Sequence, residues 1–383
     1  MEFEFTEKQN KFRALVRSFA ENEIRPRTDI IEKEGRFPWE IIKKAGEIGL
    51  LGMTVPKEYG GIGVDTISFA LAIEEISRVS GSLGLTVEAH NSLAVGHIYN
   101  RGTEEQKRKY VIPLAKGEKI GAWALTETSG GSDAASIQTT AVQDGDYWVL
   151  NGAKLFITSG DVADPVVVMA VTDKTKRAKG ISAFIVEKAT PGLSYGKEED
   201  KLGLRGTSTV ELILDNCRVP KENMLDKEGM GFIGAMETLY VGRVAIAAMA
   251  VGIAQGALEE ALKYSEKRIQ FGKPICKFQA IQWMLADMAT KIDAARLLVY
   301  RAAYLDDMGK KFVKEASMAK LFASETAMNI TQTAIQILGG HGYTDEYPVE
   351  RFFRDIKLCE IGEGTSEVQR LIISREILKE IGK

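Results

Sequence analysis

The chain has 383 residues, which is long enough for two or three domains with substantial hydrophobic cores. Its 50 Lys and Arg residues nearly balance its 53 Asp and Glu residues, so the formal net charge of −3 provides no long-range attraction for nucleic acid or anionic lipid. Any anionic ligand must therefore be held by local contacts.

The cysteines are few and widely separated. Cys217, Cys276 and Cys359 have no CxxC spacing, which argues against a disulfide framework and against a thiolate metal site, so we expect no bound metal. The first ten residues are charged, and no stretch shows the roughly 20 apolar residues of a membrane span. We therefore expect a protein of the cytoplasm, or of the mitochondrial matrix if a transit peptide has been removed, without nucleic-acid or membrane partners.

Residues 1–120 have the pattern of helices. Thr6 with Gln9, and Thr103 with Gln106, form capping boxes at two predicted helix starts. Apolar residues follow Thr6 at helical spacing, and glycines near residue 60 interrupt the pattern. This region is predicted to be an all-α N-terminal domain.

Residues 121–227 have a different period. Asp144-Gly145 and Asn151-Gly152 are dipeptides typical of hairpin turns, and they lie among β-branched and aromatic residues. Short apolar or alternating segments continue to residue 215 without a helical crossover. We predict a middle β-barrel domain, with a sandwich as the alternative, and not a doubly wound sheet.

Residues 228–383 are predicted to form a C-terminal four-helix-bundle domain, which makes the whole chain α+β. Long apolar helical runs span residues 232–268, 278–308 and 312–338. Their apolar positions are too frequent for helices that face solvent on one side, so surplus apolar surface is expected to form a subunit interface.

Three segments contain residue types suited to a ligand. Residues 123–133 combine glycines with hydroxyl groups that can approach a ligand closely, although an ordinary Gly-Ser linker has the same composition. Residues 267–279 put Arg268 and Gln279 at a basic turn before a helix, which suits a pyrophosphate but also plain solvent. Residues 336–340 end a helix with paired glycines, which capping alone explains.

Near the C-terminus, Glu363 stands between two glycines. Ser366 and Gln369 form another capping-box pattern, so a helix is predicted to begin just after the turn. A single loop glutamate is usually a solvated surface residue.

Taken in order, these segments resemble the signatures of the acyl-CoA dehydrogenase family. The family has a TE-x-x-x-GSD loop and then a W/F-I-T-like tripeptide, which match Thr126 to Asp133 and residues 156–158. The resemblance covers essentially the whole chain and implies bound FAD and a homotetramer, a dimer of dimers. The FAD contacts that it implies are Trp123, Leu125, Thr126, Gly131, Ser132, Phe156, Ile157, Thr158, Arg268, Phe271, Gln279, Gln336, Ile337, Gly339, Gly340, Thr365 and Glu367.

The resemblance, which is to short-chain, butyryl-CoA dehydrogenase-like members, also implies a reaction. An acyl-CoA thioester would become the trans-2-enoyl-CoA as Glu363 takes the α proton and flavin N5 accepts the β hydride. The Glu363 backbone amide and a flavin ribityl hydroxyl would stabilise the enolate oxygen, and enclosure would raise the pKa of Glu363 towards neutrality. Ser132, Tyr240, Arg243 and Gly364 would contact substrate, and electron-transferring flavoprotein would accept the electrons.

Two positions depart from the family pattern. Tyr240 replaces a usual aspartate and is expected to reshape the CoA or acyl pocket. Gly362 stands where many relatives have tyrosine, so the wall beside the thioester is expected to be more open. A related branch carries its base immediately before an arginine, where this chain has Gly242 before Arg243. Glycine at this position leaves the task to Glu363.

Two other functions stay open. A flavin oxidase or monooxygenase would share the fold but admit oxygen, and a non-catalytic acyl-CoA-binding scaffold would lack the base that Glu363 provides. We expect Glu88, His90 and Asn91 to shape the far end of the pocket and to be satisfied structurally, without a catalytic role.

Overall fold

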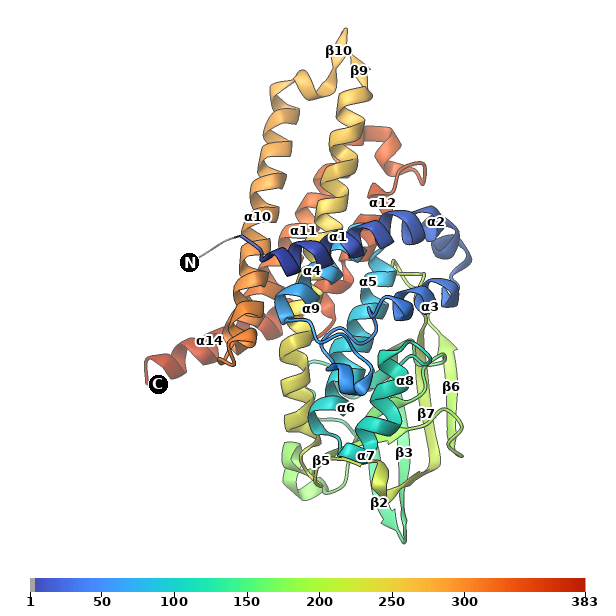
Figure 1. The fold of residues 1–383 in the computed structure, drawn as a ribbon. Helices are drawn as coiled ribbons and strands as arrows, with labels where there is room; N and C mark the ends of the chain where they lie inside the picture. Colours follow the sequence, from blue (N-terminus) through green and yellow to red (C-terminus); the bar gives the residue numbers. More distant parts are fainter. Residues whose placement is uncertain (1–3, 383) are drawn as a thin grey trace.

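The computed structural model describes residues 4–382. In sequence the strands lie between two helical regions, and in space these two regions pack against each other, with the sheet below them in the view of Figure 1. This arrangement confirms the predicted α+β architecture of helical N- and C-terminal parts with a central β domain. Residues 1–3, which belong to the charged N-terminal stretch, lie outside the described residues.

The N-terminal part is helical, as predicted. Both capping boxes are present, because Thr6 and Thr103 accept from the backbone N–H of Gln9 and Gln106, whose side chains accept in return. Its α-helices are α1 (Glu7–Phe19), α2 (Arg25–Glu34), α3 (Trp39–Glu47), α4 (Thr66–Ser77), α5 (Gly81–Glu88), α6 (Gly96–Arg101), α7 (Glu104–Gln106) and α8 (Ile112–Ala115). Shorter turns are η1 (Ala20–Ile24), η2 (Lys57–Tyr59), η3 (Ala89–Val95) and η4 (Lys107–Val111).

The middle part is one sheet with the strand order β6-β7-β3-β2-β4-β5-β8, and β1 pairs with β4. Most neighbours are antiparallel, whereas β4 is parallel to both β1 and β2. The strands are β1 (Ala122–Ala124), β2 (Thr140–Asp144), β3 (Tyr147–Thr158), β4 (Val166–Val171), β5 (Ile181–Val186), β6 (Leu193–Glu198), β7 (Thr209–Pro220) and β8 (Met224–Leu225). Short 3-10 segments, η5 (Lys174–Gly180) and η6 (Lys221–Asn223), connect them.

One of the two predicted hairpin turns is wrong. Asp144-Gly145 does connect β2 to β3, with Gly145 at φ 59°. Asn151-Gly152 instead lies inside β3, at a register shift against β7. A Cβ on Gly152 would lie 2.8 Å from the Cα of Thr139, so the glycine permits a close approach between chain segments.

The C-terminal part contains the three predicted long helices. They are α9 (Gly231–Lys267), α10 (Gln279–Asp307) and α11 (Val313–Leu338). Three further helices follow them in the chain: α12 (Val349–Ile356), α13 (Leu358–Ile361) and α14 (Ser366–Glu380). A hairpin of β9 (Ile269–Gln270) and β10 (Lys273–Pro274) followed by η7 (Ile275–Lys277) lies between α9 and α10, and η8 (Gly339–Tyr343) follows α11.

Helix α9 runs through the centre of the molecule, from the β9–β10 hairpin at the top of Figure 1 down to the sheet. Contrary to the sequence-based expectation, it is long and apolar enough to cross a membrane, with a window of mean hydropathy 1.6. Of that window, 89% is buried inside the protein, so α9 is the central core helix.

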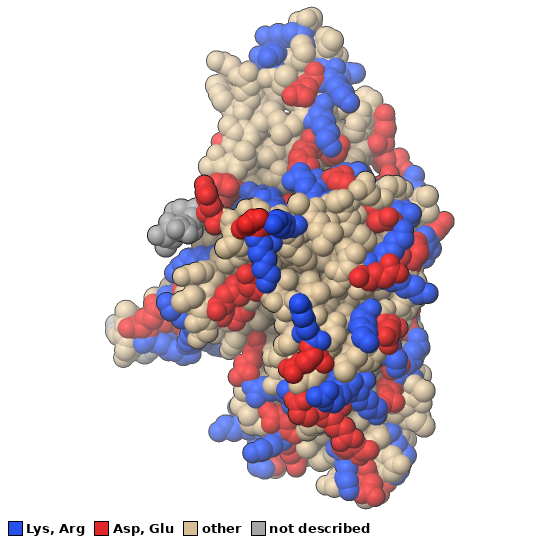
Figure 2. All heavy atoms as spheres, viewed as in Figure 1, with Lys and Arg blue, Asp and Glu red and all other residues tan. Residues whose placement is uncertain are grey.

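Charged side chains of both signs are mixed over the visible face, without a large region of one sign (Figure 2). Fewer charges lie at the upper left of that view, where Figure 1 draws α10. This helix exposes Trp283, Leu297 and Tyr304 to 65%, 48% and 52%. Exposed apolar surface of this kind is typical of an interface with another chain.

Candidate active site

Glu363 lies on a strained turn between α13 and α14. Its φ is 55°, in the left-handed region that costs a non-glycine residue about 1 kcal/mol, and Gly364 follows with φ 95°. The predicted capping box at Ser366 is wrong, because Thr365 is the N-cap and accepts from the backbone N–H of Val368. Strain at an internal carboxylate points to a functional constraint.

Side chains from three helices hold this turn. The Glu363 carbonyl accepts from Arg243 Nε of α9 at 3.4 Å and from Gln369 Nε2 of α14 at 3.2 Å. The Gly364 carbonyl accepts from Gln369 Nε2 and from Lys320 Nζ of α11, both at 2.8 Å. Arg243 and Gly364, two of the predicted substrate contacts, therefore lie beside Glu363.

Both carboxylate oxygens of Glu363 are buried, and neither has a hydrogen-bond partner among residues 4–382. Burial raises the pKa of Glu363 to about 7, against the nearby positive charges of Arg243 and Lys320, which lower it. A Cβ on Gly242 would lie 2.9 Å from the Glu363 Cδ, so a larger residue there would have to displace this carboxylate. A carboxylate with a pKa near neutral and an unused acceptor capacity suits a general base.

Glu88 was expected at the far end of the pocket, and the structure buries it. It ends α5 and is 1% exposed, and burial, with the Glu363 charge as a second cause, raises its pKa well above the ordinary value. A signal was present in the sequence, because Glu88 is the one charged residue in the otherwise apolar or small segment 81–88.

His90 and Asn91 are satisfied structurally, as expected. His90 Nδ1 accepts from the Gly121 N–H at 3.0 Å, and Nε2 lies 3.0 Å from the Leu51 carbonyl. Asn91 Nδ2 donates to the Leu50 carbonyl at 2.9 Å. Glu88 likewise has a polar partner, because its Oε2 accepts from the Ser92 Oγ at 3.0 Å.

The loop after β1 is fixed by a buried ion pair. Lys154 Nζ of β3 donates to Glu127 Oε1 at 2.6 Å and to the Leu125 carbonyl at 3.1 Å. Glu127 also accepts from the backbone N–H of Thr139 at 3.0 Å, and the Lys154 ion pair lowers its pKa against the effect of burial. The Gly-Ser segment is therefore anchored at its start and is more than a linker.

Most predicted FAD contacts of residues 123–158 surround this anchor. Thr126 accepts from the Leu155 N–H at 2.9 Å, which ties the loop to β3 next to Phe156. Phe156 is 61% exposed with φ 58°, so an apolar ring stands open beside the loop. Trp123 Nε1 donates to His97 Nδ1 at 3.0 Å, and burial lowers the pKa of His97 to about 4, which keeps it a neutral acceptor. Leu125, Gly131, Ser132, Ile157 and Thr158 lie within the same loop and strand.

The remaining predicted FAD contacts form two groups, one beside Gly242 of α9 and the other near the C-terminal end of this helix. Thr365 and Glu367 adjoin Glu363, near Gly242. The others lie at the hairpin end, where the ring of Tyr264 packs 5.9 Å from that of His341 in η8. From Gly242 to Lys267, α9 rises roughly 37 Å at 1.5 Å per residue. The structure thus does not bring the following residues to the Glu363 site of the same chain: Arg268, Phe271, Gln279, Gln336, Ile337, Gly339 and Gly340.

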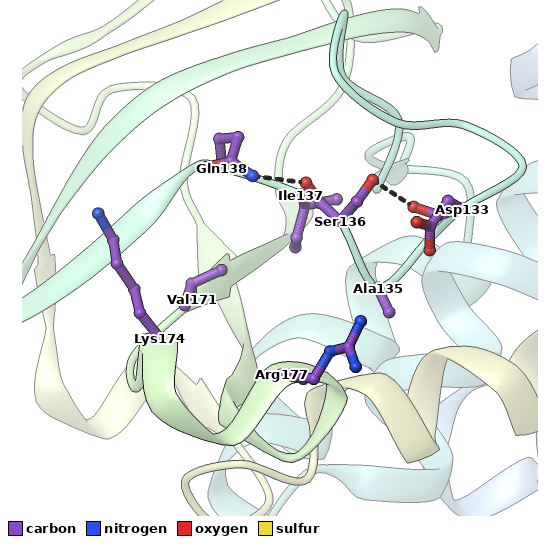
Figure 3. Close-up of a pocket in the computed structure, with 8 residues that line it drawn as sticks. All are labelled: Asp133, Ala135, Ser136, Ile137, Gln138, Val171, Lys174 and Arg177. Atoms are coloured by element: carbon purple, nitrogen blue, oxygen red, sulfur yellow. Dashed lines mark hydrogen bonds between the residues drawn. The ribbon is translucent and has the colours of Figure 1, made fainter.

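A cavity of about 260 Å³ is lined in part by the residues that follow Ser132 in the sequence (Figure 3). Asp133 and Ser136 line one side, Arg177 of η5 points towards them from below in this view, and Lys174 of η5 lines the opposite side. Two cationic side chains beside polar groups suit an anionic ligand.

Tyr240, the remaining predicted substrate contact, is half-buried on α9. Its ring lies 6.4 Å from that of Phe312, and the Arg243 guanidinium stands 5.7 Å from it. Tyr240 thus joins the wall formed by Gly242 and Arg243.

Comparison with known proteins agrees with this geometry. Family models described as acyl-CoA dehydrogenase N-terminal, middle and C-terminal domains match residues 6–118, 122–217 and 229–378. A short-chain specific acyl-CoA dehydrogenase of Clostridium acetobutylicum is 52% identical, covering 99% of this chain and 100% of the relative.

Solved structures are equally similar. Butyryl-CoA dehydrogenase from Megasphaera elsdenii superimposes with a TM-score of 0.97 at 45% identity, covering 99% of this chain and 100% of the other. A chain from a structure described as the electron transferring flavoprotein of Acidaminococcus fermentans has a TM-score of 0.98 at 51% identity, with the same coverage. The chain therefore belongs to the acyl-CoA dehydrogenase family of FAD-dependent oxidoreductases.

Proposed function

We propose that this protein converts an acyl-CoA thioester to the trans-2-enoyl-CoA, with Glu363 as the base that removes the α proton. The observation that carries the proposal is that the Glu363 carboxylate is buried without a hydrogen-bond partner among the described residues. It lies on a turn that is strained and held by side-chain hydrogen bonds. A pKa of about 7 makes this carboxylate a stronger base than an exposed one, while leaving it largely ionised just above neutral pH.

The thioester oxygen also needs stabilisation, because the α proton is only weakly acidic. Among the described residues, the Glu363 backbone N–H has no hydrogen-bond acceptor, so this donor is free for the developing enolate oxygen. Arg243 and Gln369 fix the peptide that follows it, which orients both the donor and the carboxylate. One residue thus provides the base and an oxyanion contact.

The residues present fit a flavin. Exposed Phe156, half-buried Trp123 and the anchored hydroxyl-rich loop are suited to hold the isoalloxazine ring and ribityl chain. FAD bound there would supply the two-electron oxidant for removal of the β hydrogen as hydride. Trp123 and its neighbours orient that oxidant, and Glu363 takes the proton.

The substrate is proposed to be a short acyl-CoA, as the names of the relatives suggest for those proteins. Ser132, Tyr240, Arg243 and Gly364 would contact it near the thioester. The cavity lined by Lys174 and Arg177 could hold the phosphates of CoA, because it follows Ser132 directly. Because Gly362 stands where many relatives have tyrosine, we propose a more open wall beside the base, which a branched acyl group would also fit.

Completion of the FAD site is proposed to need a second chain. The roughly 37 Å between the two groups of predicted contacts along α9 is too long for one chain to close a single pyrophosphate site. Phe271, 93% exposed with φ 51°, would reach the flavin of a neighbour, within a dimer of dimers. Electron-transferring flavoprotein is the proposed acceptor, and the cytoplasm the proposed location.

The test is anaerobic titration of the purified yellow protein with butyryl-CoA, followed by octanoyl, branched, cyclic and aromatic thioesters. We expect at least one short or branched thioester to bleach the flavin. A full panel that leaves the flavin oxidised would refute the dehydrogenase and favour a binding scaffold. Rapid reoxidation by air with peroxide release would instead identify an oxidase.

A further inference from the structure

A buried lysine contacts the turn that carries Glu363. Lys320 of α11 is 0% exposed, and its one hydrogen-bond acceptor among residues 4–382 is the Gly364 carbonyl, 2.8 Å from Nζ. Lys154, which is equally buried, forms an ion pair with Glu127 at 2.6 Å. A lysine is almost never buried completely unless it is paired. The position of Lys320 therefore needs a reason other than the packing of α11.

The Gly364 carbonyl belongs to a backbone conformation that needs support. Glu363 and Gly364 have φ angles of 55° and 95°, both in the left-handed region, which is unfavourable for the glutamate. The Glu363 carbonyl accepts from Arg243 and Gln369 at 3.4 and 3.2 Å. The Gly364 carbonyl accepts from Gln369 and Lys320, both at 2.8 Å. Lys320 is thus the contact by which α11 fixes the second peptide group of the turn.

A role in stability alone does not explain this lysine. Burial lowers the pKa of the Lys320 ammonium group to about 8, because the protein interior disfavours the charge. Without Lys320, the Gly364 carbonyl would still accept from Gln369, so no buried acceptor would be left unpaired. An apolar side chain of the same length would therefore suit the fold at least as well. A residue that lowers stability where it stands is typical of a functional site.

The titratable groups that face Lys320 leave Glu363 as the part of the site on which it acts. Arg243 of α9 is also positive, and burial raises the pKa of the Cys359 thiol of α13, so this thiol stays neutral. Glu360 of α13 is paired with another lysine at 2.5 Å. Neither carboxylate oxygen of Glu363 has a hydrogen-bond partner among the described residues. Lys320 therefore acts on the base through the backbone of the turn.

Resting on the proposed function, we propose that Lys320 is a positioning residue for the base: its ammonium group holds the Gly364 carbonyl and so fixes the turn that presents the Glu363 carboxylate to the substrate. Gly242 of α9 lies against this carboxylate, and Lys320 of α11 holds the backbone from which the carboxylate extends. Lys320 does not touch the reacting atoms.

The test is Lys320→Met, which keeps the length of the side chain and removes the ammonium group. With a thioester that reduces the wild-type flavin, we expect kcat to fall at least about 10-fold, because the base is no longer held in place, and KM to change less than about threefold. The melting temperature of the holoenzyme is expected to equal or exceed that of the wild type. Lys314→Met is the control, because this lysine lies on the same helix and pairs with Glu380, and its kcat should be unchanged.

The two readouts together separate positioning from a merely structural role. A Lys320→Met enzyme with the wild-type kcat overturns the proposal, and so does one that loses activity together with a lower melting temperature. Lys320→Gln, which is shorter by one bond and uncharged, covers the case in which the methionine variant does not fold, and the same two criteria decide its result. A wild-type flavin that no thioester reduces would instead refute the proposed function.

Discussion

Two buried glutamates in this molecule have opposite surroundings. Glu127 is 7% exposed and pairs with Lys154, which lowers its pKa and makes it a fixed negative anchor for the loop after β1. The Glu363 carboxylate has no hydrogen-bonded cation among the described residues, and burial raises its pKa to about 7. The comparison teaches that the partner, and not burial alone, decides whether a carboxyl group serves structure or chemistry.

The largest expected effect comes from removing the base. Glu363→Gln keeps the size of the side chain but cannot accept the α proton, so turnover should fall by about 100- to 10,000-fold. Flavin reduction in a stopped-flow instrument measures the loss. FAD content and the Glu360→Gln control should stay at the wild-type level, and a Glu363→Gln variant with near-normal turnover would break the contrast between the two glutamates.

Removing Lys154, the partner of Glu127, should mainly lower the stability of the protein. Lys154→Met leaves the Glu127 charge buried and unpaired, which is expected to cost about 3–5 kcal/mol of unfolding free energy. Urea denaturation checks this value. Adding Glu127→Gln removes the unpaired charge and should recover part of the loss, whereas a single variant as stable as the wild type would show that the ion pair does not anchor the loop.

Crowding the base should give a smaller effect. Gly242→Ala puts a methyl group against the Glu363 carboxylate and should displace it, lowering kcat by about 10- to 100-fold while the fold is kept. Steady-state kinetics and circular dichroism measure both properties. Glu266→Ala on the exposed face of the same helix provides the control, and equal activity in both variants would show that the carboxylate tolerates displacement.

The smallest effect is a difference in pH dependence. Because the pKa of Glu363 is raised in the folded state, this state keeps its proton to higher pH than the unfolded state does. The wild type should therefore lose stability relative to Glu363→Gln as the pH rises from 4.5 to about 7. The lowered pKa of Glu127 has the opposite sign: the wild type should lose stability relative to Glu127→Gln as pH falls below 4.5. Each slope is at most about 1.4 kcal/mol per pH unit in urea unfolding. Slopes of the same sign would contradict the comparison.

The helices were predictable because their signals are local. Capping boxes at Thr6 and Thr103 and the long apolar runs of α9 to α11 identify helices without knowledge of the fold. Asn151-Gly152 failed as a turn signal because the long pairing of β3 with β7 continues through it. The mistake of one residue at Ser366 arose because Thr365 is also a good N-cap.

The site was predictable only in part. Glu363 and its glycines were identified by resemblance, and its strained φ and raised pKa follow from tertiary packing. The proximity of Glu88 to Glu363 could not be predicted, because 275 positions separate them and no local sequence pattern records it. The hairpin residues around Phe271 were assigned to the cofactor, but their distance from Glu363 along α9 emerged only in three dimensions.

The most direct test of Glu363 as the base is exchange of the α hydrogens of butyryl-CoA with deuterium in D2O, followed anaerobically by NMR. We expect the wild type to catalyse exchange and Glu363→Gln to do so at least about 100-fold more slowly. Exchange at the wild-type rate in the glutamine variant would show that another group removes the α proton.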